Sequence, residues 1–218
     1  TSQEAKMNGH YIRFDNKSTF VFIDCETLNL CLNSVNNLPW QVSMIKSVAG
    51  KKTDERDFHV KWNTDLKISK DAARITRFDP KKLEKIGKKP EEVLPEVVDW
   101  LDNADYIVGH NILGFDIYLI RGIYKFLNKS YGHIIPKIID TLSICRGINN
   151  DIKPKDKESF LAFQFRMLNI RKKGQRNSLE AVGKSYSIDH DYSKLHDAIV
   201  DLELNLKVWN KLKYEIEI

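Results

Sequence analysis

The sequence predicts a mixed α/β fold in which a five-stranded sheet is flanked by helices. Three strand-like stretches open the chain, and short strands then alternate with helical stretches, an order typical of a mixed sheet covered by helices. The expected strands cover residues 20–27, 41–48, 58–62, 104–109 and 134–140. We expect the first three to form an antiparallel meander, because turn-forming residues at 49–52 separate the second from the third.

Residues 20–27 are expected to form the middle strand of this sheet. Phe20–Ile23 are four apolar residues without a turn former, a pattern typical of a strand buried on both faces. Side chains alternate along a strand, so Asp24 and Glu26 share one face while Cys25 points to the other. Two carboxylates this close repel each other unless a cation lies between them, and oxygen ligands alone suit Mg²⁺ or Mn²⁺.

The Asp-x-Glu pattern by itself is a weak signal. It recurs at Asp156–Glu158 and at Asp201–Glu203, and its plainer interpretation is a solvated turn that closes a strand. Partner carboxylates at the ends of other elements would favour the metal-site interpretation.

Helical patterns alternate with the later strands. Residues 71–75 and the stretch after Asp79–Pro80 are short helical candidates, since proline suits a first helical turn. Apolar spacing predicts amphipathic helices over 90–101, after Phe115, and at the C-terminal end of the chain. Further helices are expected from Thr141, over 157–169 and over 178–186. The basic run 171–176 between the last two is either a solvated loop or a phosphate-binding loop.

The composition predicts one soluble domain. A chain of 218 residues, 42% of them hydrophobic, can bury one substantial core, so we expect a single domain at 18–218 after an N-terminal tail at 1–17. Three cysteines without C-x-x-C spacing indicate neither a disulfide framework nor a zinc site. No apolar run approaches the ~18 residues of a membrane span, so no membrane partner is expected. The net charge of +5 favours a polyanionic partner without demonstrating one.

Two further acids have positions that suit a shared site. Asp116 lies on the apolar stripe of its helix, where an acid is a liability unless something pairs with it. Asp201 lies on the last helix, five residues after His196. Together with Asp24 and Glu26 these acids could enclose two divalent ions, an arrangement used for in-line attack on phosphodiesters, while a histidine takes the proton of the attacking water.

Three motifs in order resemble those of the DnaQ-like 3′–5′ exonucleases. Asp24–Thr27 resembles the first motif, Asp-x-Glu-Thr, and 110–116 is similar to the second, in which His-Asn precedes an aromatic-Asp pair. His196–Asp201 resembles the third, His-x-Ala-x-x-Asp, whose histidine marks the DEDDh branch. Asp140–Leu142 and Asn177–Glu180 are weaker echoes, and the segment 147–177 is an elaboration without a family counterpart. The resemblance implies a ribonuclease H-like fold.

The resemblance also implies roles for individual residues. Asp24, Glu26, Asp116 and Asp201 would be the ligands of two Mg²⁺ or Mn²⁺ ions, and His196 the general base. The substrate-binding residues would be Thr27, Leu28, Asn111 and Phe115. Thr27 and Leu28 would meet the terminal nucleotide through their backbone N–H groups and by packing against its base.

The implied activity is removal of nucleoside 5′-monophosphates from a DNA 3′ end, in proofreading or repair. Its partners would be a nucleic acid with a free 3′ end, single-stranded DNA foremost, and potentially a DNA polymerase. The implied location is the cytoplasm, or the host cytoplasm for a viral protein. Two alternatives stay open: the same chemistry on RNA, because no motif here reveals a contact to the 2′ hydroxyl, and a non-catalytic nucleic-acid-binding module on the same fold.

Overall fold

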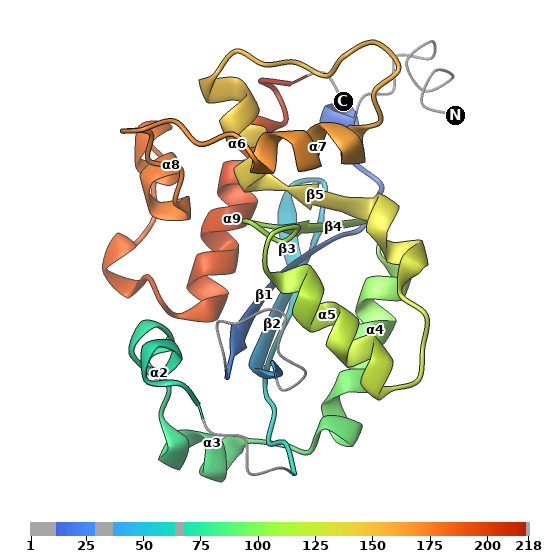
Figure 1. Cartoon of the computed structure of the whole chain (residues 1–218), viewed down its shortest axis with the longest axis vertical. Coiled ribbons are helices and arrows are strands. Elements are labelled where there is room, and N and C mark those ends of the chain that lie inside the picture. The colour runs from blue at the N-terminus through green and yellow to red at the C-terminus, as the bar shows by residue number, and fades with distance from the viewer. Residues whose placement is uncertain (1–11, 29–36, 64–67, 217–218) are drawn as a thin grey trace.

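A computed structural model describes residues 12–28, 37–63 and 68–216, with one sheet at its centre (Figure 1). Cys31, one of the three cysteines, lies outside the described residues, as does most of the expected tail. Residues Ile12–Phe14 form a short 3₁₀ helix, η1. No helix in the described ranges is long and apolar enough to cross a membrane.

The sheet has five strands in the order β3-β2-β1-β4-β5, which confirms the predicted number and the central place of β1. The strands are β1 (Phe20–Thr27), β2 (Pro39–Val48), β3 (Lys51–His59), β4 (Tyr106–Gly109) and β5 (Ile138–Asp140). β1, β2 and β3 form the predicted antiparallel meander. β4 and β5 run parallel to β1, so the sheet is mixed and the fold is ribonuclease H-like.

Helices cover both faces of the sheet. α4 (Pro90–Asn103) and α5 (Asp116–Phe126) pack against the face that carries Val21, Ile23 and Cys25. On the other face of the sheet, Phe20 and Phe22 pack against a second group of helices (Figure 1). This group consists of α6 (Thr141–Asn149), α7 (Phe160–Leu168), α8 (Leu179–Ser185) and α9 (Ala198–Leu212). β1 is therefore buried on both faces, as its apolar run predicts.

Two expected strands differ from the observed ones. β3 begins at Lys51 and ends before Trp62, because Ala49 (φ 52°) and Gly50 (φ 74°) form a tight hairpin turn that starts the pairing at once. The charged residues of this edge strand conceal it in the sequence. β5 is only three residues long, since residues Gly132–Lys137 form the 3₁₀ helix η2 and Pro136 has no N–H to donate to a strand.

Short polar side chains begin most of the helices. Ser69 caps α2 (Lys70–Thr76) and Asp79 caps α3 (Pro80–Ile86), each by accepting from backbone N–H groups of the first turn. The remaining side-chain caps are Asp140 for α6, Ser159 for α7, Ser178 for α8, Asp191 for the 3₁₀ helix η3 (Tyr192–Lys194) and Asp197 for α9. The predicted short helices near 71–75 and after Pro80 are thus confirmed as α2 and α3.

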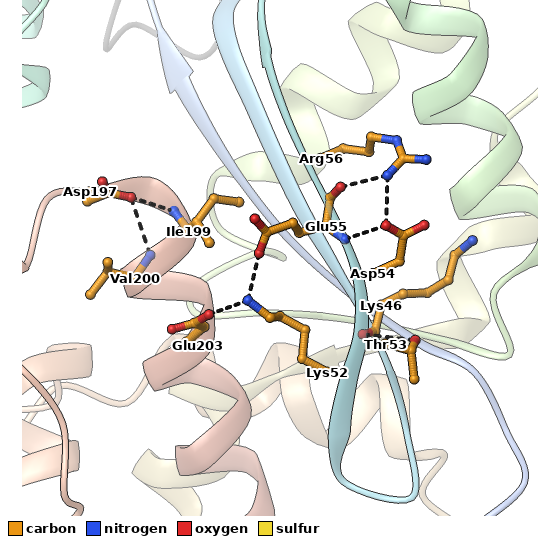
Figure 2. A network of polar contacts seen from close by, with 10 residues as sticks. All are labelled: Lys46, Lys52, Thr53, Asp54, Glu55, Arg56, Asp197, Ile199, Val200 and Glu203. Carbon is orange, nitrogen blue, oxygen red and sulfur yellow. Dashed lines mark hydrogen bonds and ion pairs between the residues drawn. The ribbon is translucent and has the colours of Figure 1, made fainter.

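Ion pairs connect the edge strand β3 to both helical layers. Figure 2 shows the ammonium of Lys52 between Glu55 of the same strand, at 2.6 Å, and Glu203 of α9. On the other side Arg56 Nε lies 2.6 Å from Glu96 Oε1 of α4, and its guanidinium stacks over Trp100. Because both pairs are partly exposed, each contributes little to the free energy of folding.

Gly109 marks the close approach of β4 to β1. A Cβ at this position would lie 2.8 Å from Ile112 Cβ and 3.2 Å from the backbone oxygen of Ile23. Since backbone and a branched core side chain cannot easily give way, only glycine fits where β4 leads into the 110–115 turn.

We therefore expect Gly109→Ala to destabilise the fold by roughly 1–3 kcal/mol, the usual cost of overpacking. The matched control is Gly122→Ala in α5, where no atom lies within 4 Å of the added Cβ. That change should stabilise the protein by about 0.5–1 kcal/mol, because alanine loses less backbone entropy in a helix. Urea denaturation measures both, and equal effects of the two substitutions would contradict the close approach.

Candidate active site

Two acids lie at the carboxyl end of β1, on the face that packs against α9. In the sheet register, Asp24 lies opposite Ser43 of β2, and Glu26 lies opposite Gln41 of the same strand. Cys25, between them, is buried on the opposite face with the α4 and α5 residues. The predicted alternation is confirmed, so both carboxylates point toward the side from which α9 approaches.

Asp116 reaches the same end of the sheet from α5. It is the first residue of that helix and only 2% exposed. Its Oδ1 accepts a hydrogen bond of 2.9 Å from the backbone N–H of Cys25. This contact, across 91 positions of sequence, fixes Asp116 against β1 beside the other two acids.

Asp201 and His196 come from the start of α9. Asp197 caps this helix by accepting from the N–H groups of Ile199 and Val200, as Figure 2 shows, and so sets the place of the first turn. In that turn both carboxylate oxygens of Asp201 accept from the backbone N–H of His196, each at 3.2 Å. His196 is exposed and has a left-handed backbone (φ 78°). The tight turn leaves its imidazole at the surface next to the acids.

The four carboxylates lie close enough to perturb one another. Burial, and then the charge of Asp201, raises the pKa of Asp24 to about 7. Burial and the charges of Asp24 and Asp201 raise the pKa of Glu26 to about 8. Burial and the charge of Asp24 raise the pKa of Asp116, and burial raises the pKa of Asp201. The structure thus gathers the four predicted acids from β1, α5 and α9 into one cluster of like charge.

The chemistry of this donor set fits a hard divalent cation. Crowded, largely buried carboxylates with little neighbouring positive charge are stabilised by Mg²⁺ or Mn²⁺, which prefer oxygen ligands. As the side chains lie, however, no group of three or more His, Cys, Asp or Glu residues in the described ranges is arranged to hold a metal ion. Asp116 already accepts from a backbone N–H group through Oδ1, and Asp201 does so through both of its oxygens.

A cavity of about 290 Å³ opens beside the acids. Asp24, Asp201 and His196 line it, and so do residues that the motif analysis did not place in the site. These are His110, Ser178, Leu179, Glu180, Leu195 and Asn205. A second cavity of about 410 Å³ shares Leu195 and His196 with the first, so His196 stands between the two.

The site and fold together match a known family. A family model described as an exonuclease (RNase_T) matches residues 21–209, which contain all four acids and His196. The chain belongs to this exonuclease family. The expected DnaQ-like exonuclease family is therefore confirmed. No curated protein sequence gives a match.

Solved structures of Escherichia coli exonuclease I share the fold of this exonuclease. The complex with a dT13 oligonucleotide is 19% identical, with a TM-score of 0.69, over 90% of this chain and 41% of that chain. The zinc-bound form of its complex with single-stranded DNA is 20% identical, with a TM-score of 0.69, over 91% and 41%. The chain thus spans about two fifths of the length of exonuclease I.

The four predicted substrate-binding residues of the exonuclease lie around the acids without lining the 290 Å³ cavity. Thr27 and Leu28, at the end of β1, are buried, and the N–H of Leu28 donates to Leu38 O at 3.1 Å. Asn111 has a left-handed backbone (φ 67°), and its side chain lies over Gly114, where an added Cβ would clash with Asn111 Oδ1. Phe115 directly precedes α5 and packs on the α4–α5 core.

Asp140 holds the turn that carries Asn111. This fully buried carboxylate accepts from the N–H groups of Asn111 and Leu113 in that turn, and of Leu142 and Ser143 at the start of α6. Burial raises its pKa to about 6, although the four N–H donors favour the ionised form. The weak motif echo at 140–142 was the only sequence signal for this role.

We expect Asp140→Ala to destabilise the exonuclease by about 2–4 kcal/mol, because it removes a helix cap and strands two further buried N–H groups. Asp79→Ala is the matched control: Asp79 accepts only from Lys81 and Lys82 at the exposed start of α3, so its loss should cost about 1 kcal/mol. Urea denaturation compares them. Equal losses would show that Asp140 acts as an ordinary helix cap.

Proposed function

We propose that the protein is a metal-dependent 3′–5′ exonuclease that releases nucleoside 5′-monophosphates from DNA by two-metal-ion hydrolysis. The observation that carries this proposal is the meeting of four carboxylates from β1, α5 and α9, where burial raises the pKa of all four and a neighbouring acid further raises those of Asp24, Glu26 and Asp116. Asp24, Glu26, Asp116 and Asp201 would hold the ions. When bound, the ions supply an activated water and stabilise the leaving 3′ oxygen. The P–O3′ bond breaks as the water oxygen bonds to phosphorus.

His196 would act as the general base. Its imidazole is exposed at the edge of the acid cluster, and its ring nitrogens have no hydrogen-bond partner in the described ranges. A free imidazole next to the acids can take the proton that the attacking water loses, since histidine changes its charge near neutral pH. The backbone bond from His196 to Asp201 would keep the base beside a metal ligand.

The substrate strand would be held by a basic segment, residues 171–176. Its cations are exposed and form no ion pair with any described residue. They are Arg171, Lys172, Lys173 and Arg176. The chain runs from this segment directly into Ser178–Glu180 of the cavity wall, so phosphates of a strand whose 3′ end enters the cavity would pass these cations.

Single-stranded DNA is the proposed substrate, and replication proofreading or repair, potentially beside a polymerase, is the proposed role. The solved complexes of E. coli exonuclease I with dT13 and with single-stranded DNA support this choice over RNA. Cleavage of RNA by the same residues is the second candidate, and it differs only in contacts to the 2′ hydroxyl.

The direct test is shortening of 5′-labelled single-stranded DNA and RNA with Mg²⁺ or Mn²⁺. We expect stepwise loss from the 3′ end of DNA, and a fall in kcat of at least about a hundredfold for both Asp24→Asn and His196→Ala. Only Asp24→Asn should also weaken metal binding. The control is Asp156→Asn, in the exposed copy of the Asp-x-Glu motif, which should leave the rate unchanged. If neither nucleic acid is shortened, the enzyme lacks the proposed activity.

Metal binding should release protons. The pKa values of Asp24 and Glu26, about 7 and 8, lie above their ordinary values. Near pH 6.5 both carboxyl groups are therefore largely protonated, and a metal ion that binds them must displace these protons. At pH 9 both are ionised, and the ion displaces almost none. The metal-free fold should accordingly lose stability as the pH rises toward 8, and Mg²⁺ should restore it.

Calorimetric titration with Mn²⁺ in two buffers of different ionisation enthalpy counts these protons. We expect more than one proton per protein at pH 6.5, almost none at pH 9, and fewer at pH 6.5 for Asp24→Asn. A proton count that does not change with pH would contradict the shared acid cluster.

A further inference from the structure

Three hydrogen bonds in series run through His110 in the wall of the catalytic cavity. Its Nε2 lies 2.7 Å from the backbone oxygen of Asn177, and its Nδ1 lies 2.9 Å from Thr141 Oγ1. Asn205 Nδ2, on α9, donates to the same Thr141 hydroxyl at 2.9 Å. The series joins α9, the start of α6, the end of β4 and the loop before α8.

The chemistry of the partners fixes the proton positions. A backbone carbonyl only accepts, so His110 Nε2 carries the hydrogen. Thr141 Oγ1 accepts from Asn205, and its own hydrogen can go to His110 Nδ1 at 2.9 Å or to Gly109 O at 3.4 Å, of which the shorter contact to His110 is the better hydrogen bond. Both ring nitrogens are thus engaged in a neutral imidazole. Burial is the main reason that the pKa of His110 lies near 4, and the charge of Arg146 lowers it further.

The residue whose backbone oxygen contacts His110 is Asn177, directly after the basic segment. Asn177 follows Arg176 directly and precedes Ser178 of the cavity wall. Its side chain also accepts from Asn149 Nδ2 of α6 at 2.7 Å. At the other side of Arg176, Gln175 donates to Asn149 O at 3.2 Å. The segment is therefore attached to the body of the enzyme at Gln175 and Asn177, while its cations face solvent.

We propose that His110 is a positioning residue, whose neutral imidazole fixes the basic segment against the catalytic cavity so that substrate phosphates meet its cations. This inference rests on the proposed function, because it assigns the segment to a nucleic-acid strand. His110 differs from His196 in the property that matters for a base: the exposed ring of His196 has no hydrogen-bond partner among the described residues, whereas both ring nitrogens of His110 have one. His110 holds the strand's contact surface and exchanges no proton with the substrate.

Thr141→Val is the most informative variant, since it removes the hydroxyl that links His110 to Asn205 and keeps the side-chain shape. Ser143→Ala is the matched control, because the hydroxyl of Ser143 is buried two residues along the same helix and has no hydrogen-bond partner in the part of the chain that the structure describes. His110→Ala breaks the series at its centre. His110→Gln is the conservative variant, since its amide can still donate to Asn177 O.

Three measurements test the proposal on the full chain. For Thr141→Val and His110→Ala we expect KM for single-stranded DNA to rise about tenfold while kcat stays within about threefold, because strand holding is lost and the acids are not. Amide hydrogen exchange of residues 171–178 should accelerate about tenfold, and ¹⁵N NMR of the wild type should show the neutral Nε2–H tautomer of His110. His110→Gln should restore most of the KM, and Ser143→Ala should change nothing.

Two outcomes would overturn the proposal. One is a Thr141→Val protein whose KM and exchange rates equal those of Ser143→Ala. The other is a His110→Ala protein that loses kcat and the rise of its pH–rate profile, as the loss of a base would cause. Failure of the proposed function gives a different result, namely no nuclease activity in the wild type. In that case the amide exchange rates of residues 171–178 and the tautomer of His110 still decide whether His110 fixes the segment.

Discussion

Repulsion among four carboxylates at the end of β1 is the constraint on which the rest of the site depends. Asp24 and Glu26 cannot separate, because they share one face of a strand that is buried on both sides. Asp116 is fixed by the N–H of Cys25, and Asp201 by the capped first turn of α9. The apolar packing of two helical layers stabilises an arrangement that the charges alone would disperse, and burial, followed by the neighbouring charges, raises the pKa values of Asp24 and Glu26.

A second set of buried polar groups places the loops around these acids. Asp140 fixes the turn after β4 to the start of α6, and His110 extends the same attachment to the loop before α8. Each of these groups is satisfied by backbone partners or by neutral side chains of fixed shape. Buried polar networks that are fully paired define one arrangement, because any other leaves a donor or acceptor unpaired in the core.

The sequence predicts most of this architecture, and its misses have physical reasons. The buried run of β1, the Asp79–Pro80 helix start and the apolar stripe under Asp116 all depend on local periodicity, which the chain obeys. The first seven residues of β3 escape prediction because an edge strand can be charged along most of its length, and its pairing is set by the hairpin turn. The roles of Asp140 and His110 depend on partners far along the chain, which no local pattern encodes.

The charge distribution explains why the residues that bind the substrate strand must be separate from the acids that cleave it. A cluster of acids repels the phosphates that it must cleave, and in the proposed mechanism only bound cations reverse that sign locally. Beyond the reach of those cations the strand must be held by the protein itself. The exposed cations at 171–176 supply the opposite charge next to the cavity wall, and hydrogen bonds that join Gln175 and Asn177 to Asn149 attach this segment to α6. Because the acids and the cations of residues 171–176 are held apart, the 3′ end of a strand would enter the cavity while its other phosphates remain outside, beside the cations.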